Sequence, residues 1–300
     1  MMRRPSQMVR GLLVRQIQDV FNDRARGEAP VVRSNDALFD RGSEIWRVHG
    51  DVTTMMIGGV TALLLQMLHP AALAGVWDHS SFRSDMLGRL RRTARFIAVT
   101  TFGERTQAEA AIARVRDVHA RISGALDDGT AYRASDPRLL AWVHVCEAMA
   151  FLEAWRAFGE PGMTRTAQDR YFAQHARIAR ALGAAPVPES RAEAEALIES
   201  FRPDLRVTGR TRAVARMILD HPPPTLAMLP TQKLVMQAAV EIMPRWARRL
   251  HGFARPPFSG PLVRGSAFAL AQTVRWAFRS DGARAAGSGR AHVQPGSSMR

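Results

Sequence analysis

The stretch 137–158 constrains the fold most, because its residues are apolar on nearly every side of a helix. A helix of that kind has to lie at the centre of a bundle, with other helices around it. Strand signals are scarce: alternating β-branched and aromatic runs are nearly absent, and tyrosine occurs only as Tyr132 and Tyr171. The sequence therefore predicts one all-α domain.

Helical periodicity recurs along the rest of the chain, interrupted by Gly- and Pro-rich linkers. For the predicted helix 106–126, Thr106 and Glu109 have the spacing of a capping box, and Gly124 marks the end. We expect an N-terminal helical arm over 1–35, a C-terminal helix within 256–281 and a disordered tail over 282–300. The predicted helices are 6–25, 36–48, 52–68, 86–102, 106–126, 137–158, 166–182, 190–200, 209–219, 231–250 and 262–278.

The formal net charge of +15 is carried almost entirely by arginine, since Lys233 is the only lysine among 42 basic residues. A basic all-α chain can be a non-enzymatic binding protein, such as a DNA-binding regulator. However, no helix-turn-helix with a short glycine turn precedes a basic helix, and no basic segment is interleaved with aromatic residues. We therefore expect no specific nucleic-acid partner, and a solvated basic surface that favours acidic partners or peripheral contact with anionic membranes.

Cys146 is the only cysteine, so no intramolecular disulfide and no CxxC site can form. Arg10 and Arg15 divide the N-terminal apolar residues, and this pattern does not match a secretory signal. Residues 52–77 lack charged Asp, Glu, Lys and Arg and are long enough to cross a membrane, but their polar residues and Pro70 favour a buried helix of a soluble bundle. We expect a cytoplasmic protein.

Several catalytic motifs are absent from the sequence. It contains no GxSxG, Walker A, GxGxxG or HExxH pattern. No glutamate is followed by a histidine three residues later, so the Glu-x-x-His pairs of a helical di-iron centre are missing as well. What remains for chemistry is a set of nine histidines, arginines within helices, and a large apolar core.

His119 lies on the apolar face of the predicted helix 106–126, together with Val115, Val118 and Ile122. Two interpretations remain open. A histidine in such a place can be a core residue whose ring is hydrogen-bonded to a carbonyl or a carboxylate. It can also be the axial ligand of a haem iron, which needs one neutral imidazole on a rigid helix among apolar neighbours.

Within 87–96, a single helix face carries Arg89, Arg92, Thr93 and Phe96. This face can be an ordinary surface with salt bridges. It also suits a site that handles reduced dioxygen, because fixed donors stabilise negative charge that develops on oxygen. Arginine keeps its proton in such a site, and its planar group can also bind a haem propionate.

Two further histidines are alternatives. Asp78 precedes His79, so the carboxylate can orient the imidazole either as a second haem-facing group or as a purely structural pair. His144 lies on the central helix close to Cys146, which we interpret as small core filler because no cation is near it in the sequence. If His119 does not hold the iron, His79 and His144 are the next choices.

Four segments occur in an order that resembles a known family: HPAALAGVWDHSSFRSDMLGRLRRTARF (69–96), ARVRDVHARISG (113–124), YRASDPRLLAWVH (132–144) and MPRWARRLHGF (243–253). Together they resemble the oxygenase family that includes the fungal MpaB oxygenase and the bacterial latex-clearing (rubber) oxygenases. The resemblance covers 36–255. It implies that this part is a single globin-like helical bundle, with extra helices, that holds one haem b.

The resemblance also assigns roles to residues. His119 is the counterpart of the axial histidine, and Arg89, Arg92 and Thr93 match an Arg-x-x-Lys-Thr face on the distal side of the haem. Arg92 replaces the lysine, which keeps the charge and changes the geometry of the donor. Phe96 and His79 complete the residues that we expect near the cofactor. Family members add dioxygen across a carbon–carbon double bond of an isoprenoid and leave two carbonyl ends.

Two departures from the family concern the substrate. The rubber-cleaving members are secreted, whereas we find no export signal, and for their distal carboxylate the nearest residue here is Asp78. We therefore expect a haem b-dependent oxygenase that uses dioxygen on an apolar, alkene-bearing small molecule. The alternatives are a haem protein of the same family with peroxygenase or isomerase activity, and the non-enzymatic binding protein.

Overall fold

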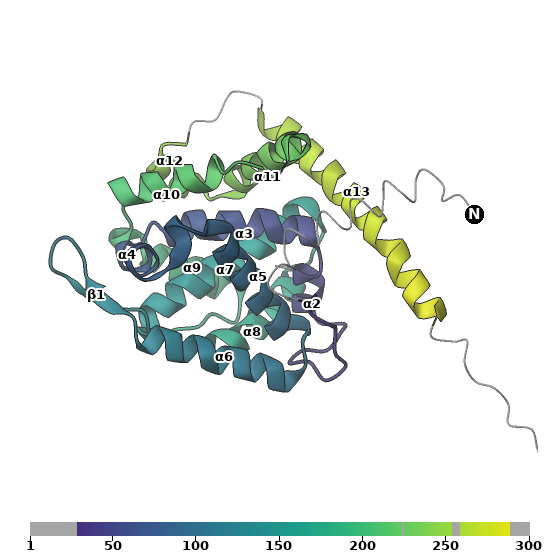
Figure 1. Cartoon of the computed structure of the whole chain (residues 1–300), viewed down its shortest axis with the longest axis horizontal. Coiled ribbons are helices and arrows are strands. Elements are labelled where there is room, and N and C mark those ends of the chain that lie inside the picture. The colour runs from purple at the N-terminus through teal and green to yellow at the C-terminus, as the bar shows by residue number, and fades with distance from the viewer. Residues whose placement is uncertain (1–28, 224, 254–258, 289–300) are drawn as a thin grey trace, which may run out of the picture.

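The computed structural model describes residues 29–223, 225–253 and 259–288. Within these ranges the regular structure is helical apart from one two-stranded hairpin, so the predicted all-α fold is confirmed. Figure 1 shows the helices gathered into one body, with the hairpin projecting at one end and α13 extending beyond the other. The predicted helix 6–25, and with it most of the arm 1–35, lies outside the described residues.

The main helices follow one another with short connections. Three of them, α5, α7 and α10, have the bounds predicted from the sequence. The bounds are α2 (Glu44–His49), α3 (Val52–Gln66), α4 (Pro70–His79), α5 (Met86–Phe102), α6 (Arg105–Ala120), α7 (Pro137–Phe158), α8 (Arg165–Ala181), α9 (Arg191–Ser200), α10 (Gly209–Leu219), α11 (Leu229–Ile242), α12 (Arg245–His251) and α13 (Ser259–Ser288). Three-residue 3-10 turns are η2 (Ser81–Arg83), η3 (Arg202–Asp204) and η4 (Leu226–Met228).

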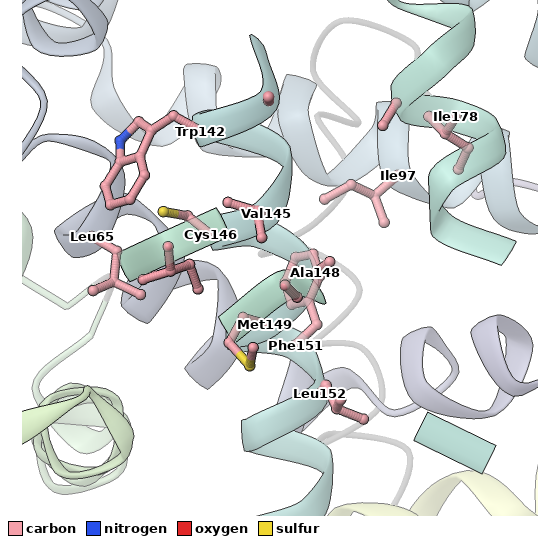
Figure 2. Close-up of a cluster of buried hydrophobic side chains, with 14 of the residues drawn as sticks. Leu65, Ile97, Trp142, Val145, Cys146, Ala148, Met149, Phe151, Leu152 and Ile178 are labelled. Carbon is pink, nitrogen blue, oxygen red and sulfur yellow. The ribbon is translucent and has the colours of Figure 1, made fainter. Parts of the chain in front are cut away.

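Helix α7 is central, as its sequence predicts. Pro137 occupies the first turn, where its missing N–H costs nothing, and Asp136 Oδ1 accepts a hydrogen bond from the Leu139 N–H at 2.9 Å. Figure 2 shows the side chains of α7 leaving the helix in several directions within one buried cluster. That cluster includes Trp142, Val145, Cys146, Met149 and Leu152 of α7, together with Leu65 of α3, Ile97 of α5 and Ile178 of α8.

Helices α3 and α7 approach closely because residue 58 is a glycine. A Cβ added to Gly58 would lie 2.7 Å from Phe151 Cδ1 and 3.0 Å from the Ala150 carbonyl oxygen. The neighbouring Gly59 has more room, since its nearest contact would be Phe151 Cε1 at 3.9 Å. One turn of α3 therefore contains a glycine that the packing requires and a glycine that it does not.

We expect Gly58→Ala to lower the free energy of unfolding by about 1–3 kcal/mol, because the two helices must move apart. Gly59→Ala is the matched control, and should raise it by up to about 1 kcal/mol because alanine favours the helix. Urea unfolding followed by circular dichroism measures both. Similar values for the two variants would show that the approach at Gly58 is not tight.

The predicted helix 106–126 is too long. Helix α6 ends at Ala120, and the chain then forms an antiparallel hairpin of β1 (Ser123–Ala125) and β2 (Ala131–Arg133). The turn contains Asp128 and Gly129, and Gly129 has a φ of +84°. An Asp-Gly pair between two short strands is a hairpin signal, and the helical pattern before it concealed this signal.

The start of α6 also differs from the prediction. Glu104 is the N-cap residue, and no side chain caps this end, so the predicted capping box of Thr106 and Glu109 is wrong. Only the second half of the predicted helix 36–48 is helical, as α2. After α3 the chain bends and forms α4, which begins at Pro70 and was not predicted; proline suits the first position of a helix.

Two predictions near the C-terminus need correction. The predicted helix 231–250 is divided into α11 and α12 at Pro244, which has no N–H to continue the helical hydrogen bonds. Helix α13 continues to Ser288, so the first part of the predicted disordered tail 282–300 is helical, consistent with the alanines in 283–286. The rest of that tail lies outside the described residues.

In the described part of the chain, no single helix is long and apolar enough to cross a membrane. Helices α3 and α4 together have the length and composition for it, but they are bent by 107° where they meet.

Candidate functional site

Helix α6 lies on the outside of the body and packs most extensively against α5 (Figure 1). Its inner side carries Ile112, Val115 and His119, and Ile122 follows just after the helix, at intervals of three and four residues. Val118, which the sequence placed on the same face, is 44% exposed. The inward face of α6 is therefore narrower than predicted, and His119 lies on it.

The imidazole of His119 receives no hydrogen bond from the described residues, and its Nδ1 atom is shielded from solvent without a partner. A buried polar atom in this state costs about 1–3 kcal/mol, so such atoms usually belong to sites that something else completes. Burial, and then the positive charge of Arg89, lower the pKa of His119 below its ordinary value. His119 is thus an uncharged imidazole, which is the form that binds metals.

An open hollow of about 450 Å³ lies beside His119. This volume is within the range of small-molecule and cofactor sites. The hollow is bordered by α6 and by two connecting segments. Its lining is formed by Ala113, Arg116, Asp117, His119 and Ala120 of α6, Ser135 before α7, and Leu182 and Gly183 after α8.

Arg89 is a half-buried cation on α5 that has no carboxylate partner among the described residues. Its guanidinium carbon lies 5.8 Å from the ring centre of Phe82. Burial, and then repulsion from Arg92, lower the pKa of Arg89. Since a buried charge is normally paired, Arg89 next to His119 marks a place where an anionic group would be stabilised.

The other residues of the predicted α5 face are arranged differently. Arg92 is exposed and donates to Ser81 Oγ at 2.7 Å and to Asp85 Oδ2 at 3.5 Å. Thr93 is also exposed, and its hydroxyl donates to the Arg89 carbonyl oxygen at 3.2 Å. Phe96 is half-buried and packs against the main core. The structure therefore brings Arg89 to His119, but leaves Arg92 and Thr93 at the surface.

His79 is exposed at the end of α4, and its ring centre lies 6.4 Å from that of Tyr132 in β2. The adjacent Asp78 forms an ion pair with Arg210 at 3.3 Å, and Arg210 also pairs with Asp127 at 3.3 Å. These contacts join α4, α10 and the hairpin. They give Asp78 a structural partner, and the structure does not bring His79 to the hollow beside His119.

His144 of α7 was considered in the sequence analysis only as an alternative iron ligand, in case His119 does not hold the iron. It is 8% exposed, and its Nδ1 atom is also buried without a partner. Burial and the neighbouring histidines His175 and His119 lower its pKa to about 4, although Glu147 opposes the shift.

Behind His144 lies a polar group inside the apolar core. The His144 and His175 ring centres are 6.0 Å apart, and His175 Nε2 lies 3.7 Å from Glu147 Oε1. Burial by itself would raise the pKa of the Glu147 carboxyl, but the contact with His175 and the electrostatic effects of His144 and His175 lower it overall. His49 of α2 lies next to His175, with ring centres 6.2 Å apart. Three helices, α2, α7 and α8, thus contribute to one buried cluster.

No group of three or more His, Cys, Asp or Glu side chains in the described ranges is arranged to hold a bare metal ion. A metal carried in a macrocycle has different needs, because the macrocycle supplies four ligands and the protein only one or two. An uncharged imidazole without a hydrogen-bond partner can bind the metal of such a group. A nearby arginine without a carboxylate partner in the described ranges can bind the anionic groups of the macrocycle. Cys146 is a poor alternative, since burial raises the pKa of its thiol.

The comparison with known families assigns this all-α body to a class, a catalytic domain of the oxygenase type. Residues 46–276 match the family described as "ER-bound oxygenase mpaB/B'/Rubber oxygenase, catalytic domain". The match covers most of the chain, and the chain belongs to this family. It extends into α13, which the sequence had set apart as 256–281. Neither a curated protein nor a solved structure gives a match.

Proposed function

We propose that this protein is a haem b-dependent oxygenase that acts with dioxygen on an apolar, alkene-bearing small molecule. One observation carries the proposal: the half-buried imidazole of His119 has a shielded, unpaired Nδ1 atom and feels the charge of Arg89, a cation without a carboxylate partner in the described part of the chain. An isolated core histidine does not need a cation next to it, and the cation further destabilises its protonated form. A ligand that offers both a metal and negative charge satisfies the two residues at once.

In this proposal His119 holds the iron through a ring nitrogen. Haem b, when bound, supplies the metal centre at which dioxygen is activated. Arg89 cannot lose its proton, so it provides a fixed positive charge for a propionate or for negative charge on oxygen. Val115 and Ile122, which lie before and after His119 on its side of the chain, would help to keep water from the imidazole when haem is bound.

The apolar substrate follows from the family and from the lining near the site. Oxygenases of the family act on carbon–carbon double bonds, as the sequence resemblance implies, and Ala113, Ala120 and Leu182 supply the apolar part of the lining beside His119. The alanines of the lining leave space for a bulky hydrocarbon. We therefore propose an isoprenoid-like alkene rather than a polar metabolite.

Incubation of the haem-loaded protein with short isoprenoid alkenes under ¹⁸O₂ tests this function. We expect cleavage into two carbonyl products that each carry one labelled oxygen atom. Product formation that needs added peroxide instead of dioxygen would favour a peroxygenase, and rearrangement without label would favour an isomerase. A haem-loaded protein that converts no alkene would contradict the proposed substrate class.

A further inference from the structure

The exposed apolar side chains of the described chain are concentrated in its C-terminal part. Seven large apolar side chains are exposed in the described ranges, and five of them lie between residues 226 and 276. A single exposed leucine needs no explanation, but a group of apolar side chains on one part of a surface marks a place where something binds. The five are Leu226 of η4 (86% exposed), Leu250 of α12, and Leu262 (74% exposed), Phe268 and Trp276 of α13.

The same part of the chain is strongly basic. Residues 209–276 contain ten arginine or lysine residues and only two acidic residues, Asp220 and Glu241. Glu241 is 7% exposed and pairs with Arg248 at 3.4 Å and with Arg264 at 3.2 Å, so it is not available to other cations. Less than a quarter of the chain therefore holds a net charge of +8, which is more than half of the total of +15. A surface of this kind attracts anionic partners.

Four exposed arginines form two pairs, each on one face of a helix. Arg212 and Arg216 are one turn apart on α10, and Arg245 and Arg249 are one turn apart on α12. None of the four forms an ion pair with a carboxylate in the part of the chain that the structure describes. Like charges at this spacing repel each other in water, and an anionic partner relieves the repulsion.

The helices turn these side chains away from the body of the protein. Arg210 of α10 faces α4, where it pairs with Asp78 at 3.3 Å, and the other two arginines of α10 lie about 160° and 120° away from it around the helix. On α12, Ala247 is fully buried and both exposed arginines lie about 160° away from it. On α13, Leu262 lies about 140° away from the fully buried Ala267. Arginine and leucine therefore share the outer side of these helices.

We call this surface the C-terminal face. In Figure 1, α10, α11 and α12 form a layer over α3 and α4, and α6 lies on the opposite side of the body. The hollow beside His119 therefore remains open when a partner covers the C-terminal face. The face is defined by Arg212, Arg216, Leu226, Arg245, Arg249 and Leu262.

Helix α13 is held firmly on the body, so its outer apolar residues are not part of a core that has yet to close. Ala267 and Ala271 are fully buried where α13 packs against α11 and α3. The only charged residues among its described side chains are Arg264 and Arg275, and both pair with carboxylates of the body, Arg275 with Asp51 at 2.6 Å. The outer side of this part of α13 therefore carries no free charge and can enter an apolar environment.

Positive charge next to exposed leucine fits one kind of partner best. A nucleic acid pairs with the arginines but leaves the leucines in water, and a second copy of this chain brings two faces of the same charge together. A bilayer with anionic lipids accepts both, because its headgroups attract arginine and its acyl chains bury leucine. We propose that the C-terminal face docks this protein on the surface of an anionic lipid bilayer. The inference goes beyond the proposed function and does not depend on haem.

Co-sedimentation of the purified full-length protein with lipid vesicles tests the docking. We expect binding to phosphatidylcholine vesicles that contain about 30% phosphatidylserine, little binding to pure phosphatidylcholine, and weaker binding as the salt concentration rises. Leu226→Ser/Leu262→Ser and Arg212→Gln/Arg216→Gln should each lower the affinity for the anionic vesicles by about tenfold or more. These four side chains are exposed, so circular dichroism should show an unchanged fold.

Two control variants remove the same kinds of side chain elsewhere on the surface. Val32→Ser removes an apolar side chain that is 82% exposed and lies outside the C-terminal face. Arg114→Gln/Arg133→Gln removes two exposed arginines, one from α6 and one from β2. Both controls should bind the anionic vesicles with the affinity of the wild-type protein.

Each other outcome overturns the proposal. Absence of binding to the anionic vesicles at low salt would do so, as would equal affinities of the face variants and the controls. A loss of affinity in the arginine variant alone would show that the face binds anions without using its leucines, and would favour a nucleic acid or an acidic protein over a bilayer. A wild-type protein that takes up no haem would contradict the proposed function and leave the docking surface in place.

Discussion

Replacing His119 with alanine is expected to abolish stable haem binding and to leave the helical fold intact. His119 supplies the protein's bond to the iron in this account, so its loss should exceed the ~10–100-fold effect of a supporting residue. The fold should survive because His119 is only half-buried and makes no hydrogen bond to the described residues. Removal of an unsatisfied Nδ1 atom should, if anything, stabilise the haem-free protein.

Haem content after purification, and far-ultraviolet circular dichroism of the same samples, measure the two effects separately. His79→Ala is the control, because His79 is an exposed histidine in a helix and should keep full haem content. Full haem occupancy in His119→Ala, with an unchanged absorption spectrum, would mean that His119 is a core histidine and that another residue holds the iron.

Arg89→Met is expected to stabilise the haem-free protein and to impair the haem-bound one. Methionine keeps the length and the packing but removes a half-buried charge that has no carboxylate partner in the described structure, which should raise the free energy of unfolding by about 1 kcal/mol. Loss of the fixed donor should lower turnover by about 10²–10³-fold, on the order of 3 kcal/mol. Opposite signs for stability and activity are typical of a functional residue.

Arg95→Met provides the comparison for Arg89. Arg95 lies on the same helix and donates to the Ala29 carbonyl oxygen at 2.8 Å, so its charge already has a partner. We expect little change in turnover and no gain in stability. The measurement also separates the two roles of Arg89: a fall in haem affinity points to a propionate, whereas a fall in turnover at full haem occupancy points to charge on oxygen.

The elements that the sequence predicts well are those whose boundaries are local. Helix α7 is apolar all round and begins with Asp136-Pro137, and its predicted bounds are correct. The errors arise where a competing local signal was outweighed by helical periodicity. Pro244 divides a predicted helix, and the Asp128-Gly129 turn replaces the last part of another.

The candidate site was only partly visible in the sequence. His119 and Arg89 were identified from their helix faces, and the structure brings them together. Arg92 and Thr93 share a helix face with Arg89 in projection, but Arg89 is half-buried whereas Arg92 and Thr93 are exposed. A helical pattern gives the spacing of side chains and not the depth to which they are buried.

The histidine cluster could not have been found from one helix. His144, His175 and His49 come from α7, α8 and α2, and each appears in the sequence as an isolated histidine among apolar residues. Only the packing of these helices shows that Glu147 lies beside two of them. The unpaired Nδ1 atoms are likewise a property of the folded chain, because a sequence does not show which polar atoms remain without partners.

A titration of the purified wild-type protein with hemin, followed by absorption spectroscopy, tests whether this chain binds haem b through His119. We expect saturation at one haem per chain, a Soret band distinct from that of free hemin, and loss of this binding in His119→Ala. A wild-type protein that is colourless after purification and shows only the non-saturable spectrum of free hemin would contradict it.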